Sequence, residues 1–276
     1  MRPLTGRLAR HVHATLVCVA GALNAITASD LLLPGRITPY GLAPREFGVA
    51  DFDGDGRQDI LVGTGDPNSN TLQYGVSLLH GKGDGTFEVR RAGLAQPYTY
   101  GPFLVVDING DRRPDVVSPT SIYPGNGPPL GGISVLLGNG DGTFARGIDT
   151  AIGPNSPFFL RSGDFNGDGA TDLVALSEGG QVCDYFGCRT ILDYIWILLG
   201  NGDGTFAPAI RMTSQGPYPV QVAVADLNGD GLDDLAVADH SGFNAPNHTS
   251  VSLFLSLGNG TFENIGGVRP DHRPRN

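Results

Sequence analysis

The chain has 276 residues, a net charge of −10 at pH 7 and 40% hydrophobic residues. That length suits one large domain or two small ones, and the hydrophobic content is enough to build a core. The acidic balance argues against a protein that holds nucleic acid by neutralising its phosphates, and it disfavours anionic membrane surfaces. Since no stretch of about 18 apolar residues is present, no membrane-spanning helix is expected.

Residues 1–28 are predicted to be an export signal. Three arginines precede the apolar run ATLVCVAGAL, which is too short to span a bilayer but suits the central part of a signal peptide. The alternative is a buried N-terminal helix. Export would place the mature chain, residues 29–276, in the periplasm or the medium. Because the arginines leave with the signal, the mature chain would be still more acidic.

The mature chain keeps two cysteines, Cys183 and Cys188, within the segment CDYFGC. In an oxidising compartment an even, closely spaced pair predicts a local disulfide. A zinc site is the alternative. It would need two more ligands, and no CxxC motif or histidine pair stands nearby.

Two short motifs recur in phase along the chain. The first is an acidic loop: DFDGDGRQD from Asp51, DINGDRRPD from Asp107, DFNGDGATD from Asp164 and DLNGDGLDD from Asp226. The second is a glycine-rich turn: GKGDGTF from Gly81, GNGDGTF from Gly138 and from Gly200, and a shortened GNGTF from Gly258. A fixed period indicates one repeated supersecondary unit. The units are expected at about 45–100, 101–156, 157–217 and 218–270.

Each unit reads as four β-strands. One apolar run enters the acidic loop and a second leaves it, a third precedes the glycine-rich turn, and a fourth begins at the phenylalanine that ends the turn. We expect that phenylalanine (Phe87, Phe144, Phe206 and Phe262) to anchor the fourth strand in the core. The third run is hydrophobic nearly throughout, as in YIWILL, so both of its faces should be covered by protein. Stacked blades of a propeller provide such cover. Strands on both sides of the acidic loop exclude an EF-hand, which has helices there.

The pairing of D-x-[DN]-x-D-G-x-x-D loops with G-x-G-D-G-T-F turns resembles the FG-GAP or VCBS repeat family, the blades of integrin-alpha-like propellers. The resemblance extends over about residues 37–270. It implies an all-β propeller with calcium between the first two strands of each blade, and members occur in adhesion proteins, lectins and non-catalytic parts of secreted enzymes. Integrin-like propellers have seven blades, whereas this chain holds four repeats. We expect a closed ring of four four-stranded blades, in which residues 35–44 pair into the last blade. An open arc completed by another copy is the alternative.

The acidic loops are predicted to bind about four Ca²⁺ ions. Calcium takes six to eight oxygen ligands, and loop positions 1, 3, 5 and 9 supply side-chain oxygens while position 7 supplies its carbonyl. The predicted ligands are Asp51, Asp53, Asp55, Arg57 and Asp59; Asp107, Asn109, Asp111, Arg113 and Asp115; Asp164, Asn166, Asp168, Ala170 and Asp172; and Asp226, Asn228, Asp230, Leu232 and Asp234. The alternative is a set of metal-free acidic turns, in which crowded carboxylates would oppose folding.

The four loops should differ in their affinity for calcium. Position 6 is glycine in three of them, but it is Arg112 in the second. A non-glycine residue at positive φ costs on the order of 1 kcal/mol. The second site should therefore be the weakest. The first loop has four carboxylates and should be among the tightest.

The loops between the second and third strands differ from unit to unit, and variable loops on a rigid scaffold are where ligands usually bind. Candidate contacts for a glycan or a cell-surface protein are Tyr123, Tyr185, His240, Phe243 and His248. An ordinary loop surface is the plainer interpretation. The sequence favours a non-enzymatic module, since no G-x-S-x-G motif is present. The alternative is a small secreted polysaccharide lyase using His240 or His248 with a tyrosine, or a hydrolase using carboxylates outside the calcium loops.

Overall fold

The computed structural model describes residues 43–65, 74–90, 103–125, 127–177, 180–184, 187–191, 194–213, 219–239 and 250–268. The regular secondary structure of these segments consists of β-strands alone, as the sequence predicts. None of the described segments contains a helix that is long and apolar enough to cross a membrane. The chain divides into two compact units, Met1–Pro39 and Tyr40–Asn276, and all of the strands lie in the second. The expected signal, residues 1–28, lies outside the described residues.

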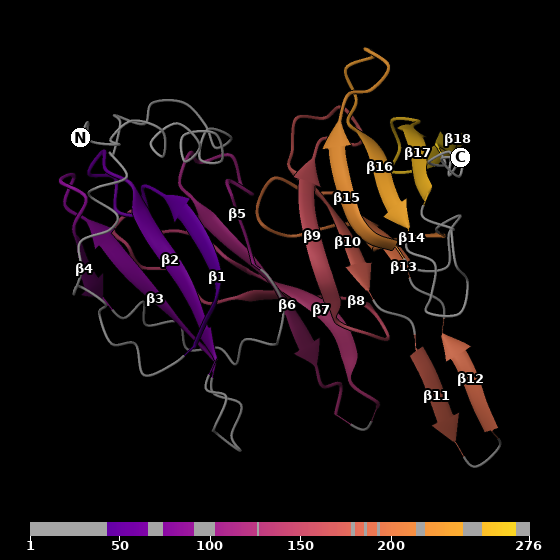
Figure 1. The fold of residues 1–276 in the computed structure, drawn as a ribbon, viewed down its shortest axis with the longest axis horizontal. Coiled ribbons are helices and arrows are strands. Elements are labelled where there is room, and N and C mark those ends of the chain that lie inside the picture. Colours follow the sequence, from indigo (N-terminus) through magenta and orange to yellow (C-terminus); the bar gives the residue numbers. More distant parts are fainter. Residues whose placement is uncertain are drawn as a thin grey trace, which may run out of the picture. The chain divides into compact units, whose positions relative to one another are not determined.

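The strands form four antiparallel sheets of four strands each (Figure 1), which confirms the expected repeat unit. The first sheet contains β1 (Ala43–Ala50), β2 (Asp59–Gly65), β3 (Tyr74–Gly81) and β4 (Phe87–Arg90). The second contains β5 (Leu104–Val106), β6 (Asp115–Ile122), β7 (Leu130–Leu136) and β8 (Ile148–Gly153). The third contains β9 (Pro157–Gly163), β10 (Asp172–Ser177), β13 (Tyr194–Leu198) and β14 (Ile210–Thr213). The fourth contains β15 (Pro219–Ala225), β16 (Asp234–Asp239), β17 (Ser250–Ser256) and β18 (Phe262–Val268).

A two-stranded hairpin, β11 (Gly180–Asp184) with β12 (Gly187–Ile191), is inserted between β10 and β13 of the third sheet. Its backbone register places Cys183 directly opposite Cys188. Directly opposed positions in an antiparallel pair lie about 4.5–5.5 Å apart at Cα. That separation falls within the range that a disulfide spans. The backbone is therefore compatible with the expected disulfide, which stays a prediction.

Proline stands at or next to the start of the first strand in three sheets. Pro44, Pro157 and Pro219 each lie beside a register shift in the pairing with the second strand. Proline cannot donate to the ladder, so it is confined to strand starts, edges and bulges. The repeated proline thus marks where each first strand begins.

The hydrophobic core lies between successive sheets. One cluster joins the first sheet to the second, another the second to the third, and a third cluster the third to the fourth. Adjacent residues of a third strand point into different clusters: Val135 packs toward the third sheet and Leu136 toward the first. Ile197 and Leu198 divide in the same way between the fourth and second sheets. The continuous apolar runs of β7 and β13 therefore have both faces covered, as expected, whereas Val251 in β17 of the fourth sheet is 39% exposed.

The phenylalanines of the glycine-rich turns pack on the preceding sheet. The ring of Phe144 meets that of Phe52 edge-on with centroids 5.7 Å apart, and Phe262 meets Phe165 at 5.6 Å. Phe206 packs against the cluster that contains Ile108. Phe87, in the first sheet, is 40% exposed. The expected anchoring is therefore wrong for Phe87, because no sheet precedes its own in the described part of the chain.

The start of the fourth strand also differs between sheets. It is the phenylalanine itself in β4 and β18. In the second and third sheets Phe144 and Phe206 form only isolated bridges, to Gly138 and Gly200, and the strands begin four residues later.

Closure of the four sheets into a ring is not found among the described residues. The clusters there join consecutive sheets, and none joins the fourth sheet to the first. Most of the segment expected to close the ring, residues 35–42, lies outside the described residues.

Candidate metal-binding loops

Each acidic loop connects the first two strands of a sheet and is wrapped around its first aspartate. Asp51 accepts hydrogen bonds from the N–H groups of Gly54 (2.8 Å) and Gly56 (2.8 Å), both glycines at positive φ. Asp164 and Asp226 hold their loops in the same way. These donors lower the pKa of Asp226, Gly229 and Gly231 being the main causes. The first aspartate of these three loops is thus fixed by the backbone that surrounds it.

The second loop contains the predicted strained position. Arg112 has φ of 68° and is the only non-glycine residue at positive φ in the described segments. Its N–H still donates to Asp107, at 2.7 Å, so the loop keeps the shared backbone geometry. The expectation of strain is confirmed, whereas the predicted weakness of this site for calcium stays a prediction.

The ninth loop residue is a buried carboxylate with two backbone partners. Asp59 is 0% exposed, and it accepts the N–H of Phe52 through Oδ2 (3.0 Å) and that of Gly81 through Oδ1 (2.8 Å). Asp115, Asp172 and Asp234 repeat both bonds in their own sheets. Sequence reasoning assigned this residue to metal alone. It also ties the loop to the end of the third strand.

Burial makes these carboxylates favourable neighbours for a cation. Desolvation raises the pKa of Asp115, against the lowering effect of hydrogen bonds from Gly138 and Ile108, and the charges of Asp111 and Asp107 raise it further. The same causes raise the pKa of Asp172. A bound cation would favour the charged form and reverse this shift.

The first loop brings carboxylate and imidazole ligand atoms together in two overlapping groups. Ligand atoms of Asp51, Asp53 and Asp59 lie within 4.8 Å of one another, as do those of Asp53, Asp55 and His80. The first cluster offers only oxygens, which is the donor chemistry of calcium. The second shares Asp53 and adds an imidazole. In the other three loops an asparagine at position 3 supplies an amide oxygen in place of this carboxylate.

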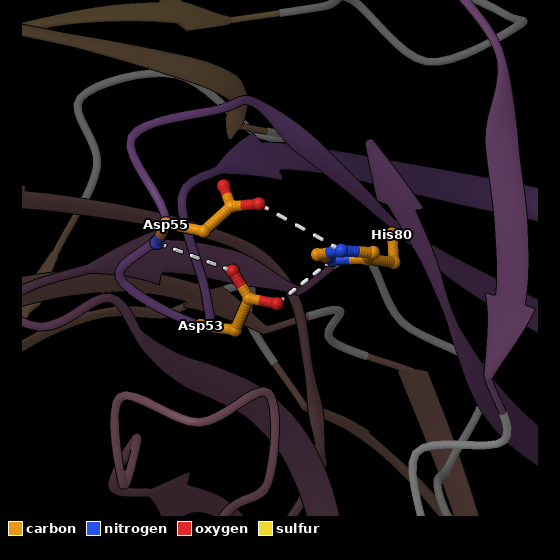
Figure 2. Close-up of side chains that lie close together, drawn as sticks. All are labelled: Asp53, Asp55 and His80. Carbon is orange, nitrogen blue, oxygen red and sulfur yellow. Dashed lines mark hydrogen bonds and ion pairs between the residues drawn. The ribbon is translucent and has the colours of Figure 1, made fainter. Parts of the chain in front are cut away.

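His80 is a site residue that the sequence analysis missed. It lies near the end of β3, and its ring faces the carboxylates of Asp53 and Asp55 (Figure 2). Nδ1 is 2.8 Å from Oδ2 of Asp53, yet this buried nitrogen has no partner in hydrogen-bonding geometry. Alignment of the repeats would have found it, because the equivalent position is leucine in the other three units.

The glycine-rich turns share one end of the sheets with the acidic loops. The N–H of Gly142, in the second turn, donates to the carbonyl of Phe52 in the first loop at 2.9 Å. The fourth turn is not shortened, which corrects the expectation from sequence. In the fourth turn the N–H of Leu257 donates to the carbonyl of Thr261 at 2.9 Å. The equivalent bond in the second turn runs from the N–H of Asn139 to the carbonyl of Thr143 at 3.0 Å. Three of its residues differ from the GNGDGTF motif, and for that reason the turn looked shorter in the sequence than it is.

Direct bonds also join loops of neighbouring sheets. Asp233 of the fourth loop and Asp164 of the third are paired twice: the N–H of Asp164 donates to Oδ2 of Asp233 (2.8 Å), and the N–H of Asp233 donates to the carbonyl of Asp164 (3.0 Å). Thr171 donates its hydroxyl to the carbonyl of Asp107 at 3.1 Å. The acidic loops therefore contribute to sheet-to-sheet packing.

One of the candidate ligand contacts lies in the described part of the chain. Tyr123, at the end of the second sheet's β6, is 76% exposed. Tyr185, His240, Phe243 and His248 lie outside the described residues, so no shared site can be drawn around them. Among the carboxylates outside the calcium loops, Asp239 is buried and accepts a hydrogen bond from the hydroxyl of Ser252, which indicates a structural role.

The described part of the chain is thus a repeat of four-stranded antiparallel sheets, each with an acidic loop between its first two strands. A family model described as "FG-GAP-like repeat" matches residues 49–118 and 164–237, together more than half of the chain. The chain therefore belongs to the FG-GAP-like repeat family. No curated protein matches.

Among solved structures, the chain is similar to the crystal structure of the V. cholerae biofilm matrix protein Bap1, at 18% identity and a TM-score of 0.38. The similarity covers 83% of this chain and 40% of that one, so the chain spans less than half the length of Bap1.

Proposed function

We propose that this protein is an exported, calcium-stabilised binding module of the adhesion type, with its four sheets serving as propeller blades. The family supports a non-enzymatic repeat module, and the convergence of carboxylates in the first loop supports the cation. That convergence carries the proposal, because closely spaced carboxylates repel one another unless an ion joins them. Calcium is the preferred ion, since magnesium keeps its waters and requires strict octahedral geometry.

In this proposal calcium is structural. An ion that binds only the folded state stabilises it by mass action, by about 2.7 kcal/mol per site at 100 times the dissociation constant. The test is thermal unfolding of metal-stripped protein in EDTA and after calcium is restored, with titration calorimetry to count the ions. We expect a marked rise in Tm and about four ions per chain. An unchanged melting curve would refute the structural role.

The ligand of the module would be a glycan or a cell-surface protein, bound at the loops between second and third strands. Tyr123 supports this, because its exposed ring offers the flat apolar contact that stacks on a sugar. A glycan array probed with wild type and with Tyr123→Ala, each with and without calcium, tests the proposal. Assays for reducing ends and unsaturated products on polysaccharides test the lyase or hydrolase alternative. Turnover that is lost in His240→Ala or His248→Ala would replace the binding proposal with an enzyme.

Export is part of the same proposal. The expected signal, residues 1–28, should be absent from protein collected outside the cytoplasm, as N-terminal sequencing would show. Cys183 and Cys188 should then form a disulfide across the β11–β12 hairpin. Alkylation followed by mass spectrometry tests this directly, since a disulfide blocks labelling until a reductant is added. Labelling of both thiols without a reductant would exclude it.

A further inference from the structure

The first sheet exposes an apolar face that its counterparts bury. Phe47 is 59% exposed, Val49 56%, Phe87 40% and Val89 40%. We name these four residues the leading face. The residues equivalent to Phe47 in the third and fourth sheets are Leu160 and Val222, which are 3% and 2% exposed because each packs on the sheet before it.

The glycine-rich turns show the same contrast. A Cβ placed on Gly142 would lie 3.1 Å from Leu78 of the preceding sheet, and one on Gly204 would lie 3.1 Å from Leu137. A Cβ on Gly260 would lie 3.0 Å from Leu199. At Gly85, the equivalent in the first sheet, no atom of the described residues lies within 4 Å of such a Cβ. The leading face thus lacks the neighbour that every other sheet has.

The fourth sheet exposes the opposite half of the same interface. Leu227 is 48% exposed and Val251 is 39% exposed; we name this pair the trailing face. The equivalents of Leu227 are Phe52, Ile108 and Phe165, at 2%, 2% and 0%, each covered by the following sheet. The equivalents of Val251 are Ile133 and Ile195, both fully buried in the same way.

The two faces therefore match each other. At the internal junctions the turn phenylalanine of one sheet packs on the second loop residue of the sheet before it, as Phe144 does on Phe52. Phe87 is the unmatched phenylalanine and Leu227 the unmatched loop residue. A leading face against a trailing face would repeat a junction that this chain already forms between its own sheets.

We propose that the chain associates head to tail with a second copy, the leading face of one packing on the trailing face of the other. Both faces are exposed in one chain and no cluster of the described residues joins them, so a second copy can supply the missing sheet to each. Exposed apolar residues that gather on one face commonly mark such interfaces. A head-to-tail contact forms a closed ring if its rotation closes, and two copies then contribute two identical junctions.

The test is sedimentation velocity of the full exported chain in calcium, from low to high micromolar concentration. Phe87→Asp inactivates the leading face and Leu227→Asp the trailing face. Tyr123→Asp is the matched control, an exposed aromatic on neither face. We expect wild type and the control to dimerise, and each face variant to dissociate more than about tenfold more readily. An equimolar mixture of the two face variants should recover a dimer, because one intact junction remains available.

The two face variants distinguish head-to-tail association from a symmetric dimer and from a monomer. A symmetric dimer through leading faces alone would be broken by Phe87→Asp but unaffected by Leu227→Asp, and that result overturns the proposal. A monomeric wild type at every concentration also overturns it. If either face variant then lowers Tm without changing mass, the faces are covered within one chain, by ring closure or by residues 29–42. None of these outcomes depends on which ligand the module binds.

Discussion

Replacing Asp59 tests whether the ninth loop residue stabilises the fold independently of metal. Its carboxylate is fully buried and accepts two buried N–H groups, from Phe52 and Gly81. Asp59→Ala leaves both donors unpaired, whereas Asp59→Asn keeps one acceptor oxygen and presents an amide N–H₂ to the other donor. The matched control is Asp55→Ala. Asp55 accepts the N–H of Arg57 in an exposed bond, where water can take its place.

The magnitudes follow from the number of donors left unpaired. A buried donor without a partner costs about 1–3 kcal/mol, so Asp59→Asn should lose about 1–3 kcal/mol and Asp59→Ala about 2–6 kcal/mol. These are large fractions of a total stability that is usually about 5–15 kcal/mol. The control should stay within about 0.5 kcal/mol in the absence of metal.

Urea unfolding in EDTA and in calcium separates the two roles of the loop. In EDTA the order of stability should be wild type and Asp55→Ala together, then Asp59→Asn, then Asp59→Ala. In calcium, Asp55→Ala should lose part of the calcium-dependent gain, because it removes a predicted ligand and otherwise only exposed contacts. A metal-independent role of Asp59 is refuted if Asp59→Ala is as stable as wild type in EDTA, or if the control loses as much stability as Asp59→Ala.

Three further substitutions test other features of the same end of the sheets. Arg112→Gly should stabilise the protein by up to about 1 kcal/mol, because glycine reaches positive φ without strain; an unchanged urea midpoint would contradict this. Asp233→Ala should cost about 1 kcal/mol in unfolding experiments, since it leaves the half-buried N–H of Asp164 without its acceptor. The hydroxyl and N–H of Thr143 lower the pKa of Asp141 from 3.8, so the stability that its charge provides is present above pH 3.8 and lost as pH falls through the lowered value. Asp141→Asn should therefore be less stable than wild type at pH 7 and lose that difference in acid; a difference that does not change with pH would refute the linkage.

The repeat unit could be predicted because its local signals agree with one another. Glycines at fixed positions require positive φ, prolines mark the first strands, and the continuous third run requires cover on both faces. Those signals are short-range, and each occurs in at least three units. The inserted β11–β12 hairpin could not be predicted in the same way, because it occurs in one unit only and interrupts the period. The prediction depended on repetition of a pattern, so a feature that occurs only once could not be predicted.

The double role of the ninth aspartate was missed for a different reason. Its spacing fits a calcium ligand, and sequence alone does not show that Gly81 lies beside it, 22 residues away. His80 was missed because it belongs to no motif, and only a comparison of the four units shows that it stands in place of a leucine. The fourth turn was taken to be shortened because its substitutions changed the residues without changing the backbone bonds. For Asp59 and His80 the chemistry depends on a contact between two segments, whereas a motif describes only one of them.

The burial of the first and last sheets can be interpreted by comparing equivalent positions of the repeat. A motif recurs when every unit meets the same surroundings, so identical sequence positions should have identical burial. Phe87 and Phe144 occupy one position in the repeat, yet the first is 40% exposed and the second packs on Phe52. The first turn has an aromatic side chain at a position where the described residues leave it 40% exposed. A solvated turn would gain nothing from that residue, whereas a junction with another sheet would, and the exposed leucine at position 227 is the surface it fits.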